Sequence, residues 1–302
     1  MSVWLPPLRH PVRTIGARTF DFSRRVAVMA VVNRTPDSFY DRGATFGLDA
    51  AVRACLAAVA AGADWIDIGG VPFKPGPVLP VDDEIARVVP VIEALRRESD
   101  VVISVDTFQA EVARHAVVAG ADVINDTTGI HDPALAEVVA DSEATLVITH
   151  SLAEPRTVFP RPQYDDVVAE VAGFLSERVD LAVSLGVPEA RIVVDPGHDL
   201  NKNTLHTLEL TRRFDEIAAL GLPALAAVSN KDFIGETLDA PRGDRLEGSL
   251  AAAVYCIAQG ARIVRMHNVP ESVAAVRMTE AILGLRAPAH LKHNMGDAND
   301  DD

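Results

Sequence analysis

Apolar residues fall in eight runs of strand length, and polar residues gather at the C-terminal end of each run. The runs cover residues 25–33, 64–70, 101–107, 122–129, 145–150, 191–197, 222–231 and 261–269. Each run is rich in Val, Ile, Leu or Ala and is nearly continuous, whereas a half-exposed strand would alternate with polar residues. The pattern therefore predicts parallel strands that are buried on both faces.

Stretches with a helical pattern separate the runs. They cover residues 48–62, 82–98, 109–120, 133–140, 164–186, 207–221, 244–260 and 271–284. Three of these stretches lead into the next strand through similar phrases, AAGADWI, VAGADVI and AQGARIV, in which a glycine ends the helix. This alternation predicts an α/β fold, a TIM (β/α)8 barrel built as a single domain.

The barrel accounts for residues 26–286 of the 302-residue chain. Residues 1–25 are predicted to form a short N-terminal extension with a peripheral pair of strands. Residues 287–302 contain few apolar residues and end in GDANDDD, so we expect a disordered acidic tail.

Composition and charge narrow the class of protein. The chain is 48% hydrophobic but only 5% aromatic, which predicts a large aliphatic core. A net charge of −15 argues against nucleic-acid or anionic-membrane partners, because both need a basic surface. Without an 18-residue apolar stretch or an apolar signal core, we expect a cytoplasmic protein with no membrane span. Cys55 and Cys256 lie far apart within predicted helices, so we interpret both as buried apolar residues.

The polar residues at the strand ends suggest one binding pocket, because barrel enzymes build their sites at that end. Carboxylates and amides there can pair with the donor edge of a heterocycle. Arg265 and His267 are two apart on one strand and point the same way. With Lys231 they suggest a pyrophosphate or carboxylate subsite, whereas the alternative is that the Arg and Lys form structural ion pairs with Asp195 and Asp106. The candidate residues are Asn33, Asp106, Asn125, Asp195, Lys231, Arg265 and His267.

The loops after the strands offer further candidates. Asn33, followed by Asp37 and Asp41, can present oxygen ligands to Mg²⁺ together with a substrate phosphate, or these residues merely shape turns. Lys74 can reach a phosphate, although a solvated loop lysine is the commoner outcome. His198 is expected to be a solvated loop histidine.

With these residues at its strand ends, the chain resembles the dihydropteroate synthase family, whose members join a dihydropterin pyrophosphate to p-aminobenzoate. The resemblance extends from Val26 to Leu285 and is carried by MAVVNRTPDSF, DIGGVPFKPG, SVDTFQAEVA, GADVINDTTG, VVDPGHDLNK, SNKDFIG and RIVRMHNV. It implies that the pterin ring is held by Asp106, Asn125, Asp195 and Lys231. It also implies that the pyrophosphate and Mg²⁺ are held by Arg265, His267 and Asn33, and that the protein is a homodimer.

The chain departs from the family pattern where the second substrate and the loops act. After the second strand the family resembles GG-Glu-Ser-Thr-Arg-PG, and this chain has Phe73 for a small hydroxyl residue and Lys74 for the arginine. Asn230, beside Ser229 on the same second-substrate side, replaces the arginine of the family's Ser-Arg-Lys. Lysine cannot make the bidentate contact with phosphate that arginine makes. We therefore expect these changes to weaken both the pyrophosphate subsite and the subsite for the second substrate.

A chain that retains the pterin-binding residues but has altered substrate loops resembles the divergent second copy of this enzyme in some actinobacteria. We therefore expect a dihydropteroate synthase homologue with little or no synthase activity, able to bind pterin-like or p-aminobenzoate-like ligands. Two alternatives stay open. One is an active synthase that uses 6-hydroxymethyl-7,8-dihydropterin pyrophosphate, Mg²⁺ and p-aminobenzoate, and the other is a non-catalytic binding or scaffold protein.

Overall fold

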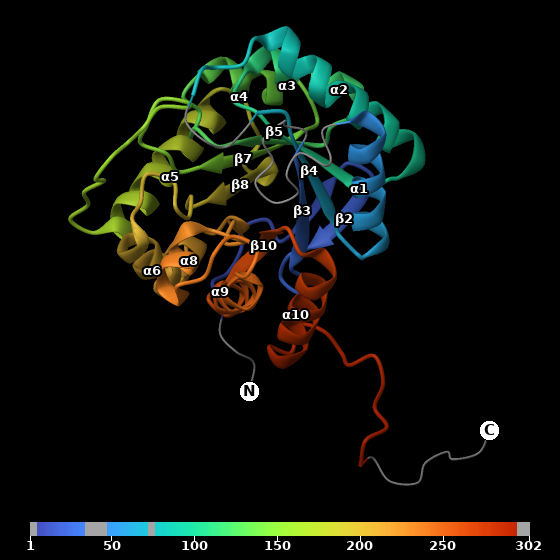
Figure 1. Cartoon of the computed structure of the whole chain (residues 1–302), viewed down its shortest axis with the longest axis vertical. Coiled ribbons are helices and arrows are strands. Elements are labelled where there is room, and N and C mark those ends of the chain that lie inside the picture. The colour runs from blue at the N-terminus through green and yellow to red at the C-terminus, as the bar shows by residue number, and fades with distance from the viewer. Residues whose placement is uncertain (1–4, 34–46, 72–75, 295–302) are drawn as a thin grey trace.

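Eight parallel strands close into a barrel in the computed structural model, which describes residues 5–33, 47–71 and 76–294 (Figure 1). Around the ring the order is β10-β3-β4-β5-β6-β7-β8-β9. Each strand lies inside one of the predicted apolar runs, so the predicted barrel is confirmed. The strands are β3 (Ala27–Asn33), β4 (Trp65–Gly69), β5 (Val102–Asp106), β6 (Val123–Asp126), β7 (Thr145–Thr149), β8 (Ile192–Asp195), β9 (Ala224–Ala226) and β10 (Ala261–Met266).

Helices surround the barrel and bury the outward-facing side chains of the strands. Val28, Ile66 and Ile103, for example, belong to the large core shared by strands and helices. Burial on this outer face explains why the strands are nearly continuous apolar runs. The helices are α1 (Leu48–Ala60), α2 (Val81–Glu98), α3 (Ala110–Ala119), α4 (Pro133–Ala140), α5 (Val167–Ser184), α6 (Thr204–Arg212), α7 (Phe214–Ala218), α8 (Asp232–Leu238), α9 (Leu246–Ala258) and α10 (Val269–Ile282), with a 3-10 turn at Glu189–Arg191.

The N-terminal extension forms the predicted strand pair, which closes one end of the barrel. Strands β1 (Val12–Ile15) and β2 (Arg18–Asp21) are antiparallel. Phe20, fully buried, meets the Trp65 ring edge-on at 6.1 Å and stacks on Phe22 at 5.6 Å. These rings share a second core with the inward-facing side chains near the N-terminal ends of the strands. The hairpin is therefore more than peripheral, because it leaves only the opposite end of the barrel open to a ligand.

The structure differs from the predicted pattern mainly between β8 and β10. The predicted strand at 222–231 is β-structure only over β9, and the predicted helix at 207–221 is divided into α6 and α7 at Arg213. The sequence pattern missed α8, which is seven residues long and contains Gly235. A Cβ atom at Gly235 would lie 2.2 Å from the Arg245 guanidinium, so this glycine makes room for a buried arginine.

Other predicted features have mixed outcomes. Cys55 and Cys256 are free and buried, in agreement with the prediction. In the ranges that the structure describes, no helix has the length and apolar character needed to cross a membrane. Residues 287–294 of the predicted tail form neither helix nor strand, while residues 295–302 lie outside the described part of the chain.

Candidate functional site

The predicted polar residues lie at the open end of the barrel. Strand pairing aligns Asn33 with Gly69, Gly69 with Asp106 and Asp106 with Asn125, which places these positions at one level. Thr149 is aligned with Asp195 in the same way. Ser229, Asn230 and Lys231 connect β9 to α8, and His267 directly follows β10. Phe73, Lys74, Asp37 and Asp41 lie outside the described residues.

Side-chain alternation explains why polar groups collect inside the barrel. The second core fills the interior with Trp65, Val102, Val123 and Ile263, one from each of four strands. Residues two positions further along a strand point to the same side. The next inward-facing layer is therefore polar and consists of Asp67, Ser104, Asn125 and Arg265.

Asp67 is the centre of this polar layer, and the sequence reasoning missed it. Its side chain is fully buried and accepts hydrogen bonds from Ser104 Oγ at 2.6 Å, Arg265 Nε at 2.7 Å and Asn125 Nδ2 at 3.3 Å. A buried carboxylate needs such partners, because burying it unpaired would be costly. The signal in the sequence was an acid in the middle of an apolar run, DWIDIGG, which we had assigned only to a strand.

Arg265 also pairs with Asp106, so the structural ion pair considered as an alternative is present for this arginine. Arg265 Nη2 lies 3.3 Å from Asp106 Oδ2 and 2.7 Å from Asp67 Oδ2. Burial and the neighbouring Asp67 raise the pKa of Asp106 to about 7, although Arg265 opposes the shift. Two carboxylates and one guanidinium thus share the mouth, and Asp106 is poised to change its charge near neutral pH.

Two further groups complete the cationic side of the mouth. The backbone N–H of His267 donates to Ser229 Oγ at 3.1 Å, and His267 Nδ1 lies 3.0 Å from the same oxygen. Lys231 directly precedes α8 and is half-buried; burial lowers its pKa, while Asp199 and Asp195 act in the opposite direction. Arg265 influences the pKa of both Lys231 and Asp195, which places these predicted residues within electrostatic range of one another.

Asn230 is turned into the protein. Its φ of 58° is left-handed, a conformation that asparagine tolerates better than most residues. Its backbone N–H donates to Ser249 Oγ at 3.0 Å, and its carbonyl accepts from Arg245 Nη1 at 3.1 Å. The side-chain Nδ2 is buried and has no hydrogen-bond partner among the described residues. The amide therefore does not present a donor to the mouth as an arginine would.

The loop after β8 is held by buried cationic and aromatic groups. Asp195 Oδ1 accepts from the Gly197 N–H at 2.7 Å, and Lys202 Nζ lies 2.9 Å from His150 Nδ1. Burial, more than any neighbouring charge, lowers the pKa of Lys202 to about 7. This loop is fixed from within rather than left open to solvent.

His198, in the same loop, is fully buried, so the prediction of a solvated histidine is wrong. The ring stacks on Phe214 at 6.0 Å and on Phe233 at 6.3 Å, and neither ring nitrogen has a hydrogen-bond partner in the ranges that the structure describes. Burial lowers the pKa of His198 to about 3. The histidine acts as an aromatic spacer, because the short helices α7 and α8, which supply the two phenylalanines, enclose it.

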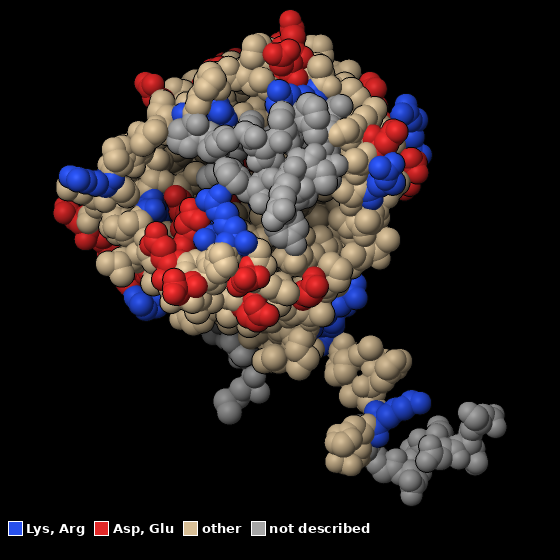
Figure 2. Space-filling view, in the orientation of Figure 1, with Lys and Arg blue, Asp and Glu red and all other residues tan. Residues whose placement is uncertain are grey.

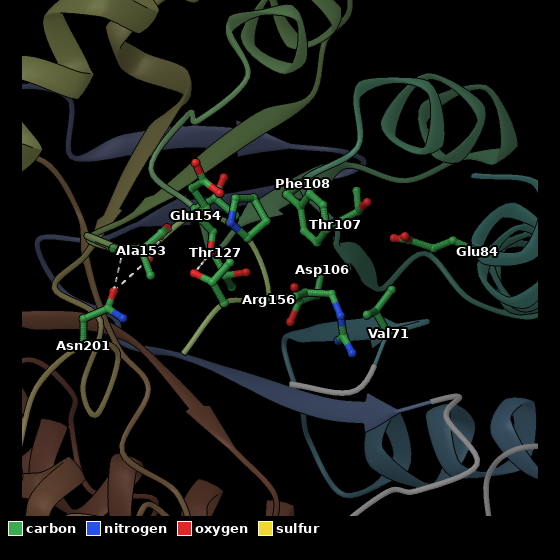
Figure 3. A pocket seen from close by; sticks show the side chains of 14 residues that line it. Val71, Glu84, Asp106, Thr107, Phe108, Thr127, Ala153, Glu154, Arg156 and Asn201 are labelled. Carbon is green, nitrogen blue, oxygen red and sulfur yellow. Dashed lines mark hydrogen bonds between the residues drawn. The ribbon is translucent and has the colours of Figure 1, made fainter. Parts of the chain in front are cut away.

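A pocket opens beside the polar layer, between the ends of β5 and β6 and the segment 151–157 that follows β7 (Figure 3). Asp106, which pairs with Arg265 of the polar layer, also lines the pocket. The other lining residues include Glu84, Thr107, Phe108, Thr127 and Arg156.

Figure 2 shows that Asp and Glu side chains gather near α8, where Asp232, Glu236 and Asp239 lie, so the acidic character predicted from composition extends to this face.

Comparisons with known proteins agree with this geometry. Residues 29–267 match the family model described as pterin binding enzyme. A protein named inactive dihydropteroate synthase 2 from Mycobacterium leprae is 50% identical over 274 residues, covering 87% of this chain and 93% of that protein. Its namesake from Mycobacterium tuberculosis is 47% identical over 270 residues, covering 87% and 85%.

Among solved structures, Xanthomonas albilineans dihydropteroate synthase with 4-aminobenzoic acid superposes with a TM-score of 0.83. It is 38% identical in sequence, and the match covers 90% of this chain and 98% of that one. The family model and the mycobacterial relatives each cover well over half of the chain. The chain therefore belongs to the dihydropteroate synthase family of pterin-binding enzymes.

Proposed function

We propose that this protein binds a pterin-like ligand at the open end of the barrel but has little or no dihydropteroate synthase activity. The observation that carries the proposal is the state of Asn230. Where the family has an arginine, this chain has a short amide whose nitrogen is buried and has no partner within the described part of the chain. A second substrate with a carboxylate then lacks the guanidinium that would hold it. The names of the mycobacterial relatives support the same conclusion.

We infer that the residues that would bind the pterin ring are retained. Asp106, Asn125 and Asp195 lie at strand ends, and Lys231 directly precedes α8. Arg265 influences the pKa values of Asp106, Asp195 and Lys231. Carboxylate oxygens can accept from the amino and ring N–H groups of a pterin, and lysine can donate to its carbonyl oxygen. Specific binding of the heterocycle is therefore compatible with weak turnover.

The anion subsite is weaker than a count of cations suggests. Arg265 already holds Asp67 and Asp106, so a pyrophosphate must compete with two carboxylates for it. Lys74 and His267, with Arg265, are the groups that we assign to the anion. The loss of one bidentate phosphate contact costs about 1.5–3 kcal/mol, or roughly tenfold to a hundredfold in affinity.

We expect Mg²⁺ to bind only together with the pyrophosphate of the substrate. Among the described residues no group of three or more His, Cys, Asp or Glu side chains is placed to hold a metal ion. Asn33, at the end of β3, offers one neutral oxygen. Mg²⁺ keeps several waters and binds substrate phosphates readily, so one protein ligand and a pyrophosphate make a compatible set.

We also propose a cytoplasmic homodimer. Large apolar side chains are exposed on the neighbouring helices α9 and α10: Tyr255 is 44%, Met278 62% and Ile282 67% exposed. An apolar surface of this kind favours a protein partner. Sedimentation equilibrium at micromolar concentration measures the state, and a monomer would contradict the dimer.

Two alternatives remain as measurable outcomes. An active synthase would turn over at the rate of an ordinary family member. A scaffold protein would fail to bind the pterin at all.

A reversal experiment tests the cause of the weak activity. The triple variant Phe73→Thr, Lys74→Arg and Asn230→Arg restores the family residues and should raise turnover, or the affinity for the dihydropterin pyrophosphate, by at least about tenfold. Because position 230 has a φ of 58°, folding of the variant must be checked by unfolding in urea. A folded triple variant with no gain would place the defect in other loops.

A further inference from the structure

Lys202 carries a buried ammonium group and is not one of the residues assigned to the ligand. It belongs to the loop after β8 (residues 196–203), two residues before α6 begins, and is only 7% exposed. Its Nζ donates to the Gly197 carbonyl at 3.0 Å and to the Leu200 carbonyl at 3.0 Å, and it lies 2.9 Å from His150 Nδ1. An ammonium has three N–H donors, so protein acceptors use all of them.

His150 is a fixed acceptor for this ammonium. A protonated lysine has no lone pair, so Nδ1 of the histidine must accept, which requires a neutral imidazole. Burial, and then the nearby Lys202, lower the pKa of His150 to about 2, in agreement with that state. The ring lies edge-on to Phe174 at 4.8 Å, and the His150 backbone N–H donates to the Asp195 carbonyl at 2.9 Å. Lys202 is therefore tied to a rigid point at the end of β7.

Three left-handed residues bend the loop after β8 around the ammonium. The φ angles are 69° at Gly197, 64° at Asp199 and 50° at Asn201. A Cβ atom at Gly197 would lie 2.4 Å from the His150 carbonyl oxygen, so a larger residue does not fit there. Aspartate and asparagine tolerate the left-handed conformation better than most residues, but it costs free energy and persists only where surrounding contacts hold it. Lys202 supplies two of those contacts through the carbonyls that it binds.

Gly197 connects the ammonium to Asp195. Its carbonyl accepts from Lys202 Nζ, and its N–H donates to Asp195 Oδ1 at 2.7 Å. Burial lowers the pKa of Lys202 and raises that of Asp195, and each group opposes the shift of the other. The orientation of the Asp195 carboxylate at the open end of the barrel thus depends on a residue that Lys202 holds in place.

Other titratable groups also surround Lys202. Those that face it are His150 from β7, Asp195 from β8, His198 and Asp199 from its own loop, His206 from α6 and Lys231 from the segment before α8. Only two of them are acids. Asp199 Oδ2 accepts from the backbone N–H groups of Asp232 and Phe233, and Asp195 has the larger influence on the pKa of Lys202. Asp195 is therefore the main counter-charge of the ammonium.

We propose that Lys202 is a positioning residue for the ligand site, whose ammonium orients the Asp195 carboxylate toward the donor groups of a bound heterocycle. The inference rests on the proposed function, because it takes Asp195 as an acceptor for a pterin-like ligand. Lys202 acts through Gly197 and through its charge, since its own donors are used within the protein.

The positioning should weaken when the ammonium loses its proton. Burial lowers the pKa of Lys202 to about 7, so the charged form is replaced by the neutral amine as pH rises above neutrality. A neutral amine has two N–H donors for three acceptors and no charge to balance Asp195. Above neutral pH the loop after β8 is therefore held less firmly.

The test titrates 6-hydroxymethyl-7,8-dihydropterin into the whole protein by calorimetry. This probe has the heterocycle without the pyrophosphate, so it reports on the ring-binding groups. At pH 6, Lys202→Met should weaken binding at least about tenfold, the size of one hydrogen bond to a charged group. Equal affinities of the variant and the unmodified protein would overturn the proposal.

Tyr164→Phe is the matched control. The Tyr164 hydroxyl donates to the Asn201 carbonyl of the same loop at 2.8 Å, and its removal leaves the contacts of Lys202 intact. The affinity of this variant should stay within about twofold of the unmodified protein. A tenfold loss in Tyr164→Phe as well would overturn the proposal, because any loosening of the loop would then have the same effect as removing the ammonium.

Two measurements separate positioning from a purely structural role. The ratio of affinities between the unmodified protein and Lys202→Met should fall from about tenfold at pH 6 to less than about threefold at pH 9, where Lys202 itself is largely neutral. Titration of Asp106 or of the ligand is common to both proteins and cancels in this ratio, so a constant ratio would overturn a role for the charge. In an Asp195→Asn background, Lys202→Met should change the affinity by less than about threefold, whereas a full tenfold loss there would contradict action through Asp195.

Urea unfolding at pH 6 checks that each variant folds. If Lys202→Met does not fold, Lys202→Gln takes its place with the same expected loss, because an uncharged amide cannot bond to all three acceptors. Absence of dihydropterin binding by the unmodified protein would contradict the proposed function itself. Binding that the substitution of Lys202 leaves unchanged would overturn only this inference.

Discussion

Replacing Asp106 with asparagine should stabilise the protein at alkaline pH and weaken pterin binding at the same time. The carboxyl group pairs with Arg265, which also pairs with Asp67, and burial together with Asp67 raises the pKa of Asp106 from 3.8 to about 7. The folded state therefore holds a proton on Asp106 that the unfolded chain has lost. For such a group, stability falls as pH rises from the unfolded pKa to the folded one.

The magnitude follows from the size of this pKa shift. A rise from 3.8 to about 7 corresponds to about 4 kcal/mol lost once the group is ionised. The Asp106 side chain is 24% exposed and shares Arg265 with Asp67, so we expect a smaller effect of about 1–3 kcal/mol. Asparagine has nearly the same shape and no charge, so the variant should gain this full amount at pH 8 and less at pH 5, where only part of the loss between the two pKa values has occurred.

Urea unfolding at pH 5 and pH 8 measures the difference. Asp232→Asn is a control of opposite sign: burial would raise the pKa of Asp232, but Arg245 and Arg242 lower it, so its removal should destabilise the protein at pH 8. Asp106→Asn should also bind pterin at least about tenfold more weakly, because an acceptor for its N–H groups is lost. A loss of stability at pH 8 in Asp106→Asn would refute the argument that burial and the neighbouring Asp67 disfavour the ionised form of Asp106.

Three further outcomes follow from the fold and the site. His198→Leu should reduce acid sensitivity, because burial lowers the pKa of His198 to about 3 and the unmodified protein loses stability on this account as pH falls from about 6.5 toward 3. The difference between unfolding free energies at pH 7 and pH 4 should be smaller in the variant, and an unchanged difference would contradict a buried neutral histidine. Phe20→Ala should cost about 3–5 kcal/mol in urea unfolding, because Phe20 fills the closed end of the barrel; a cost below about 1 kcal/mol would mean that the hairpin is dispensable. Affinity for the pyrophosphate should fall with ionic strength, since cations at the mouth act against a net charge of −15; salt-independent binding measured by calorimetry would exclude the cationic group as the anion subsite.

The sequence was sufficient to predict the barrel, because all eight strands are buried on both faces and appear as apolar runs. It also predicted that Asp106, Asn125, Asp195 and Arg265 lie at the open end of the barrel, since a polar residue at the end of such a run is conspicuous. Asp67 was missed for the opposite reason: it lies within a run and is compensated by Ser104, Asn125 and Arg265, contacts that only the closed barrel creates.

Burial of short segments was harder to predict. Loop position suggested a solvated His198, but α7 and α8 enclose it, and these helices are too short to leave a clear periodic pattern. The burial of Glu84, whose Oε1 has no hydrogen-bond partner among the described residues, was equally hard to predict. In the sequence Glu84 is one of several acids in the first turn of a helix, where exposed acids are common. Contacts between loops that are distant in sequence, such as Asn201 with residues 151–153, decide the shape of the pocket.

The most direct test of the central claim is a single-turnover measurement. The protein is saturated with 6-hydroxymethyl-7,8-dihydropterin pyrophosphate and Mg²⁺, binding is confirmed by calorimetry, and p-aminobenzoate is then added while dihydropteroate is quantified. We expect measurable pterin binding, with dihydropteroate formed at least about a hundredfold more slowly than by an ordinary synthase, because two guanidinium contacts are lost. Product formation at the ordinary rate would contradict it.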